Sequence, residues 1–276
     1  MKLFSTAKVN LFLDITGYDN TDGYHYIDSL FQEVSLYDEI EIYQSDNDVV
    51  EFINLDIKEN STVHKALRLL KENFNIKDNY KIVIKKNIPV GAGLGGGSSN
   101  AAFVLKYFRD RYNLDNSKIL EIARKIGSDV PFFIYGGLCR VSGKGEKIEK
   151  LSSKLDKITF LVIYPDIFVK TSWAYSLIDD KKPTANLPDF KNISLITIDF
   201  LEKILYNKFQ IFVFKALPEL KAIYEKLAKT LNCRAIFMSG SGSSLVALYE
   251  DAYKALEDSV LVRERFGFFA NVCIGL

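Results

Sequence analysis

A glycine-rich run at residues 89–102 constrains the fold more than any other part of the chain. It reads Pro-Val-Gly-Ala-Gly-Leu-Gly-Gly-Gly-Ser-Ser-Asn-Ala-Ala, with five glycines in the seven positions 91–97. Glycine adopts backbone angles that other residues avoid, so such a loop can turn several N–H groups toward one point. The apolar spacing of residues 98–112 predicts a helix. Because a glycine loop leading into a helix N-terminus favours a bound anion, we expect a nucleotide phosphate there.

Two other glycine-loop motifs fit this run less well. A P-loop ends in Gly-Lys-Ser or Gly-Lys-Thr, and the run contains no lysine. The dinucleotide fingerprint GxGxxG matches at Gly91, Gly93 and Gly96. However, residues 87–89 separate that match from the strand expected at 80–84, and no βαβ pattern precedes it. A purely structural turn is also a poor explanation, because a turn needs only one or two glycines.

Composition excludes several classes of protein. The 276 residues are 48% hydrophobic and 26% charged, which suits a globular chain of one or two domains. A net charge of +1 gives no electrostatic reason to expect binding to nucleic acid or to a membrane. Three widely spaced cysteines, Cys139, Cys233 and Cys273, suit a reducing cytoplasm. Two histidines are too few for a histidine-rich metal site, and no signal peptide or apolar span is visible.

Periodicity along the chain predicts a mixed order of helices and strands. Strands are expected at 7–15, 39–43, 80–84, 158–164, 235–238 and 245–249, and helices at 98–112, 171–178 and 218–231. Further helices are expected after caps at Asn60-Ser61 and at Ser117, the second ending at Gly127. A hairpin is expected within 140–150, and loops at 151–157 and 180–192. This order indicates an α+β chain with two domains, 1–155 and 156–276.

Two charged residues form the first candidate for chemistry. Lys8 shares one face of its strand with Asn10, although a lone strand lysine is more often an exposed edge residue. Asp129 follows the end of a helix and precedes Val-Pro-Phe-Phe, a partly enclosed setting in which a turn or capping role is also common. If Lys8 and Asp129 meet, the ammonium stabilises an alkoxide and the carboxylate accepts a hydroxyl proton.

Aromatic and small residues form a second set of candidates. Tyr24 and His25 follow a turn at Asp22-Gly23, and a tyrosine face can stack on a base. Lys144 is either a solvated hairpin tip or a ligand-binding cation, and Tyr175 is either core or a second aromatic face. Residues 239–243, Ser-Gly-Ser-Gly-Ser, form a second small-residue loop. The presence of two such loops in one chain favours a cleft for a nucleotide and a substrate more than one loop alone would.

Taken together, these motifs resemble the GHMP kinases, a superfamily of small-molecule kinases. A lysine-containing N-terminal strand, a Pro-xxx-Gly-Leu-Gly-…-Ser-Ser-x-Ala loop and a C-terminal small-residue loop occur in that family's order. Ala7-Lys8-Val9-Asn10-Leu11, Asp22-Gly23-Tyr24-His25 and Ser128-Asp129-Val130-Pro131-Phe132-Phe133 are most like the members that act on a cytidylated alcohol of the non-mevalonate isoprenoid pathway. The resemblance implies a two-domain fold whose second domain is ferredoxin-like.

The resemblance also implies roles for individual residues. Lys8 and Asp129 would be the catalytic pair. The remaining sets are the cytidine pocket at Asn10, Tyr24, His25, Lys144 and Tyr175; the diphosphate contact at Gly240, Ser241, Gly242 and Ser243; the ATP loop at Pro89, Gly91, Gly93, Leu94, Gly95, Gly96, Gly97, Ser98 and Ser99; and Asn60 on the adenine side.

The resemblance implies ATP, carried as its Mg²⁺ complex, as the phosphoryl donor, with no dedicated protein metal site. The partner is a small-molecule substrate, with no nucleic acid and no membrane, and oligomeric state is not predicted. Two alternatives stay open. One is a GHMP kinase of the homoserine or mevalonate type. Residues 22–25 and the long glycine run argue against this alternative. The other is a non-catalytic nucleotide-binding protein, which should lack Lys8 or Asp129.

Overall fold

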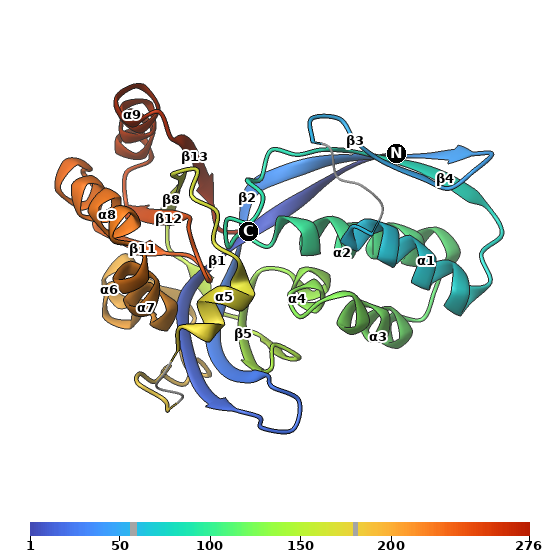
Figure 1. Cartoon of the computed structure of the whole chain (residues 1–276), viewed down its shortest axis with the longest axis horizontal. Coiled ribbons are helices and arrows are strands. Elements are labelled where there is room, and N and C mark those ends of the chain that lie inside the picture. Colours follow the sequence, from blue (N-terminus) through green and yellow to red (C-terminus); the bar gives the residue numbers. More distant parts are fainter. Residues whose placement is uncertain (56–59, 179–181) are drawn as a thin grey trace. The chain divides into compact units, whose positions relative to one another are not determined.

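The computed structural model describes residues 1–55, 60–178 and 182–276 (Figure 1). By their internal contacts these residues divide into two units. The first unit consists of Met1–Ala7, Leu36–Val90 and Gly95–Gly136. The second unit consists of Lys8–Ser35, Gly91–Leu94 and Gly137–Leu276. Each unit draws on separate segments of the chain, and the expected domain boundary at 155/156 stays a prediction.

The strands are β1 (Lys2–Tyr18), β2 (His25–Ser45), β3 (Val49–Phe52), β4 (Asn79–Lys85), β5 (Leu138–Gly143), β6 (Lys147–Lys150), β7 (Lys154–Leu155), β8 (Thr159–Tyr164), β9 (Leu195–Ile196), β10 (Tyr206–Asn207), β11 (Ala235–Met238), β12 (Leu245–Tyr249) and β13 (Phe269–Ile274). The α-helices are α1 (Thr62–Phe74), α2 (Gly96–Tyr112), α3 (Asn116–Ile126), α4 (Val130–Tyr135), α5 (Thr171–Ser176), α6 (Ile198–Ile204), α7 (Lys208–Ala216), α8 (Pro218–Thr230) and α9 (Ala252–Leu261). A π-helical segment, Val262–Phe266, follows α9.

The first unit places helices against a sheet. β4 pairs with β2 in antiparallel register and with β3 in parallel register. Figure 1 shows α1, α2, α3 and α4 gathered on one side of β3 and β4. Ser61 caps α1, because its Oγ accepts a hydrogen bond of 3.3 Å from the backbone N–H of His64, as the sequence predicted.

The second unit contains a ferredoxin-like layer. Its four-stranded sheet has the order β11-β12-β8-β13, with every neighbouring pair antiparallel. The strands of this sheet and the helices that pack on it follow one another as β8, α8, β11, β12, α9 and β13, which is the β-α-β-β-α-β order. The two-residue strands β9 and β10 lie between β8 and α8 and belong to other sheets. Helices α8 and α9 pack on this sheet (Figure 1). The α+β class and the ferredoxin-like layer expected from the resemblance are therefore present.

Most elements predicted from periodicity are present, and one cap was misassigned. Asp115, not Ser117, caps α3, because its Oδ1 accepts a 2.9 Å hydrogen bond from the backbone N–H of Lys118. A carboxylate ahead of the first turn also complements the helix dipole, so it competes well with a serine. Gly127 ends α3 as predicted, and β5 and β6 form the hairpin expected within 140–150.

The predicted loops need small adjustments. Residues 151–157 include the two-residue strand β7. The loop expected at 180–192 is free of helix and strand at residues 182–192, while 180 and 181 lie outside the described residues. Among the residues that the structure describes, no helix combines the length and apolar character needed to cross a membrane.

Candidate active site

The glycine loop needs its glycines for two physical reasons. Gly91, Gly93 and Gly95 have φ values of 68°, 75° and 71°, the left-handed region that strains other residues. A Cβ on Gly91 would lie 2.3 Å from the Phe168 ring, and a Cβ on Gly93 would lie 2.3 Å from the carbonyl oxygen of Ser239. The backbone here is therefore both bent and closely packed, as expected of a loop shaped to hold a ligand.

Helix α2 begins directly after this loop and is uncapped by any side chain. Gly95 is its N-cap residue, and its first turn contains no acidic residue. Ser99, in the first turn, is buried, and its Oγ has no hydrogen-bond partner among the described residues. Thr62 Oγ1 donates a 2.6 Å hydrogen bond to the carbonyl oxygen of Gly97. A 17-residue helix with free N–H groups and an unsatisfied hydroxyl at its start fits a phosphate group.

In the second unit the two small-residue loops touch each other. The backbone N–H of Ser244 donates to the Ala92 carbonyl oxygen at 3.3 Å, and Ser239 Oγ donates to the Gly93 carbonyl oxygen at 3.4 Å. Gly240 has a φ of 58°, and a Cβ there would lie 3.0 Å from the Gly93 oxygen. Residues 91–94 and 239–244 thus lie against each other, and the nucleotide and substrate cleft inferred from two such loops stays a prediction.

Asn207 holds the second loop in place, and the sequence analysis did not identify it. Its Nδ2 donates to the carbonyl oxygens of Met238 at 2.6 Å and Gly240 at 2.9 Å. Its Oδ1 accepts from the backbone N–H of Gln210 at 3.4 Å, so it also caps α7. An asparagine ahead of a helix is a recognisable cap, but its second role depends on a loop 31 residues away.

Lys8 is a buried residue, not an edge lysine. Only 4% of it is exposed, and its backbone N–H donates to the Leu94 carbonyl oxygen at 3.0 Å. Its Nζ lies 2.6 Å from Asn10 Oδ1 and 4.7 Å from the centre of the Phe31 ring. Asn10 Nδ2 in turn donates to Ser29 Oγ at 3.1 Å. Burying an ammonium is costly, so such a residue is kept for a reason other than solubility.

Asp129 lies in the first unit, at the start of α4. It is half-buried, and the next residues, Val130 to Phe133, are buried, which confirms the partly enclosed setting. Its carboxylate makes no capping hydrogen bond to α4, so the capping role weighed from the sequence does not apply. Lys8 and Asp129 belong to different units, and their meeting stays a prediction.

His25 and Tyr175 stack on each other in the second unit. Their ring centres are 4.9 Å apart with an interplanar angle of 24°. Tyr18 meets the His25 ring edge-on at 4.9 Å, and Phe209 meets Tyr175 edge-on at 4.8 Å. Tyr24 lies outside this stack and is 61% exposed. The structure therefore brings together two of the three predicted ring residues and leaves the third at the surface.

Lys144 is fixed by two carboxylates. Its Nζ lies 2.8 Å from Asp19 Oδ2 and also pairs with Asp22. The hydrogen bond to Asp19, followed by that to Asp22, raises the pKa of Lys144, and the same contact lowers the pKa of Asp19. Tyr26 also donates to Asp19 at 3.0 Å. Lys144 thus ties the β5–β6 turn to the β1–β2 connection that carries Tyr24.

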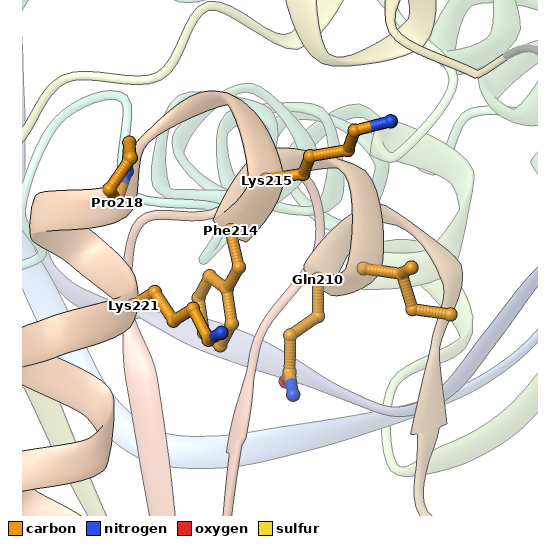
Figure 2. A pocket seen from close by; sticks show the side chains of 6 residues that line it. Gln210, Phe214, Lys215, Pro218 and Lys221 are labelled. Carbon is orange, nitrogen blue, oxygen red and sulfur yellow. The ribbon is translucent and has the colours of Figure 1, made fainter.

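Two of the hollows on the described residues differ in how they relate to the predicted site. One, of about 540 Å³, is lined by Asp48, Val49, Val50, Asn60, His64, Lys65 and Arg68. It is the hollow that includes Asn60, the residue expected on the adenine side. The other, of about 460 Å³, lies on α7 and α8 and is lined by the residues that Figure 2 shows: Gln210, Ile211, Phe214, Lys215, Pro218 and Lys221. It contains none of the predicted site residues.

Among residues 1–55, 60–178 and 182–276, no group of three or more His, Cys, Asp or Glu side chains is arranged to hold a metal ion. The start of α2 offers backbone N–H groups and the Ser99 hydroxyl to a phosphate group. The Mg²⁺ that should accompany ATP stays a prediction.

Two family models match the sequence, one on each side of the chain's middle. Residues 61–137 match the GHMP kinases N-terminal domain, and residues 194–260 match the GHMP kinases C-terminal domain. The first match includes the loop and start of α2, and the second includes the loop at 239–243. The chain therefore belongs to the GHMP kinases.

Relatives within that family align with most of the chain. A 4-diphosphocytidyl-2-C-methyl-D-erythritol kinase of Thermosipho melanesiensis is 40% identical over 88% of this chain and 89% of the relative. One of Clostridium tetani is 38% identical over 90% of this chain and 91% of the relative. A crystal structure of 4-(cytidine 5'-diphospho)-2C-methyl-D-erythritol kinase has a TM-score of 0.84 and 29% identity, and the match covers 100% of both chains. Within the GHMP kinases, this chain groups with these 4-diphosphocytidyl-2-C-methyl-D-erythritol kinases.

Proposed function

We propose that this chain transfers the γ-phosphoryl group of ATP to the C2 hydroxyl of 4-diphosphocytidyl-2-C-methyl-D-erythritol, a step in isoprenoid precursor synthesis. The observation that carries phosphate binding is the uncapped, acid-free start of α2 with its buried, unpartnered Ser99 hydroxyl. The choice of substrate is supported by relatives of that name at 40% and 38% identity. Homoserine and mevalonate kinases share the fold at 16% and 18% identity, which supports no substrate assignment.

For the chemical step we assign Asp129 as the general base and Lys8 as the charge stabiliser. Asp129 would accept the C2 hydroxyl proton as the oxygen attacks the γ-phosphorus. Lys8, oriented by Asn10 at 2.6 Å, would stabilise the developing alkoxide. Phosphoryl transfer needs mainly positioning and charge neutralisation, so two oriented groups suffice on the protein side. Mg²⁺, bound with ATP, would neutralise the phosphate charge.

For the cytidine end we assign the aromatic cluster of the second unit. Tyr175 and His25 supply stacked faces and a polar ring edge, and Tyr24, next to His25 in sequence, supplies an exposed ring. Asn10 and Lys144 add polar groups, and residues 240–243 add backbone N–H groups for the diphosphate. Pro89, Gly91 and residues 93–99 would hold the ATP phosphates, with Asn60 on the adenine side.

We further propose a cytoplasmic enzyme that acts on small molecules and binds neither nucleic acid nor membranes. The net charge of +1 and the three cysteines at 139, 233 and 273, none of which forms a disulfide, support that assignment.

The identity of the product tests the proposed function. Purified protein is incubated with Mg-ATP and 4-diphosphocytidyl-2-C-methyl-D-erythritol, and the mixture is followed by ³¹P NMR. We expect ADP and a new phosphomonoester whose ³¹P signal is not split by hydrogen, because C2 carries a methyl group and no hydrogen. A phosphomonoester on another hydroxyl would refute the regiochemistry, and ATP hydrolysis without any new ester would refute the kinase assignment.

A further inference from the structure

Asp38 occupies the centre of a buried polar cluster in the first unit. The residue is 0% exposed. Its Oδ1 accepts backbone hydrogen bonds from Asn87 and Ile88, both at 2.8 Å. Its Oδ2 accepts from Asn100 Nδ2 at 2.8 Å and from Lys86 Nζ. One carboxylate therefore binds the segment that enters the glycine loop and the helix that leaves it.

Asn100 is the helix-side partner in this cluster. It lies in the first turns of α2 and is 1% exposed. Its Nδ2 also donates to Ser5 Oγ at 2.7 Å, and its Oδ1 accepts from Lys86 Nζ at 3.1 Å. Each polar group of this side chain thus has a partner, so its position, and that of the α2 start, is fixed relative to Asp38.

Stability alone is a poor explanation for this cluster. Burial lowers the pKa of Lys86, with Asp38 opposing the shift. A buried ion pair often stabilises no more than apolar residues of similar size, whereas it fixes geometry strongly. The ammonium also lies beneath the helix start, since a Cβ on Gly96 would be 3.1 Å from Lys86 Nζ. The charged groups of Asp38 and Lys86 therefore lie beside the backbone that enters the glycine loop and the backbone that begins α2.

We propose that Asp38 is a positioning residue for ATP. By holding the N–H groups of Asn87 and Ile88 on one side and Asn100 on the other, it sets the spacing between the entry to the glycine loop and the N-terminus of α2. It touches no phosphate itself. This inference rests on the proposed ATP-binding role of the loop.

The test exchanges the two polar partners. Asp38→Asn puts a second amide N–H₂ opposite that of Asn100, and Asn100→Asp puts two carboxylates together. The double variant Asp38→Asn/Asn100→Asp restores one amide and one carboxylate at these two positions. The carboxylate at position 100 is then the partner of Lys86. Asp14→Asn is the matched control, because Asp14 is also 0% exposed and lies 3.7 Å from a buried lysine, Lys208. Its partners belong to the second unit.

Calorimetric Kd values for Mg-ATP and for the cytidylated substrate are measured with thermal unfolding. We expect each single variant at 38 or 100 to raise the ATP Kd about ten-fold or more, since each leaves buried polar groups unpaired. The substrate Kd should not change. The double variant should recover ATP affinity, and Asp14→Asn should lower the unfolding temperature without changing the ATP Kd.

Three outcomes would overturn the inference. They are an unchanged ATP Kd in Asp38→Asn, an equal loss in Asp14→Asn, and a double variant that unfolds like wild type yet binds ATP as weakly as the single variants. If a single variant does not fold, the double variant alone decides. Absence of ATP binding in the wild-type protein would instead refute the proposed function, so the two failures are distinguishable.

Discussion

The ammonium of Lys8 lies 2.6 Å from Oδ1 of Asn10, two residues along the same strand. Both side chains are buried, and the Asn10 amide is itself held by Ser29 Oγ at 3.1 Å. The Asn10 amide therefore orients the Lys8 ammonium. An oriented cation suits the stabilisation of negative charge that develops during a reaction.

Replacing Lys8 tests that role. Lys8→Met keeps most of the apolar stem but removes the ammonium, so we expect kcat to fall roughly 10²–10³-fold, the range for losing one charge-stabilising donor. The ATP Kd should change much less. Lys2→Met, on the same strand but with a 49% exposed side chain, is the control and should retain wild-type kcat. Equal steady-state rates for the two variants would contradict the assignment.

Asp129→Asn preserves size and removes the proton acceptor. We expect kcat to fall roughly 10²–10⁴-fold, the usual contribution of a general base, with ATP affinity nearly intact. Asp115→Asn, which alters the cap of α3 in the same unit, should affect stability and leave kcat unchanged. Single-turnover measurements separate chemistry from product release. A variant at 129 that keeps most of its turnover would eliminate this residue as the base.

Gly95→Val tests the phosphate loop. The residue has a φ of 71°, so valine strains the backbone where the N–H groups should face phosphate. We expect loss of calorimetric ATP binding in a protein that remains folded by circular dichroism. Gly267→Val is the control variant with a matched backbone strain, because Gly267 has a φ of 70° and nothing lies within 4 Å of an added Cβ. If both variants bind ATP normally, the loop is only structural.

Tyr24→Ala tests the cytidine pocket. Because Tyr24 is 61% exposed, its removal should leave the fold intact. Base stacking on an aromatic ring is worth about 1–3 kcal/mol, so KM for the cytidylated substrate should rise about ten-fold or more. ATP affinity should not change. Tyr253→Ala, at a 79% exposed tyrosine of α9, should alter neither value. An unchanged KM for the Tyr24 variant would remove this residue from the pocket.

The sequence predicted the elements whose signals are local. The helical spacing after the glycine run, the period-two pattern at 7–15 and the serine cap of α1 each depend on neighbouring residues. The two helices and the strand that they predict are present, although both faces of β1 are buried at residues 5–15. Helices α4, α6, α7 and α9 were missed, because they are short or carry a mixed apolar pattern. Their helical state depends on caps such as Thr197 and Asp251 and on packing in the second unit.

The supporting residues of the site could not be predicted in the same way. Asp38 and Asn100 hydrogen-bond across 62 positions, and Asn207 binds carbonyl oxygens 31 and 33 positions away. No local pattern encodes such partners. The predicted ring pocket also changed in detail, because His25 stacks on Tyr175 while Tyr24 faces solvent. Candidate motif residues could thus be proposed from the sequence, whereas the long-range partners that Asp38, Asn100 and Asn207 contact could not.

The central claim, that this kinase selects a cytidylated alcohol, is tested most directly by ADP release with competing acceptors. The purified enzyme is given Mg-ATP with 4-diphosphocytidyl-2-C-methyl-D-erythritol, 2-C-methyl-D-erythritol, homoserine or mevalonate, and kcat/KM is measured for each. We predict turnover with the cytidylated compound, none above background with the three free alcohols, and inhibition by cytidine diphosphate. Turnover of homoserine or mevalonate, or equal turnover of methylerythritol with and without its cytidine diphosphate group, would contradict the account.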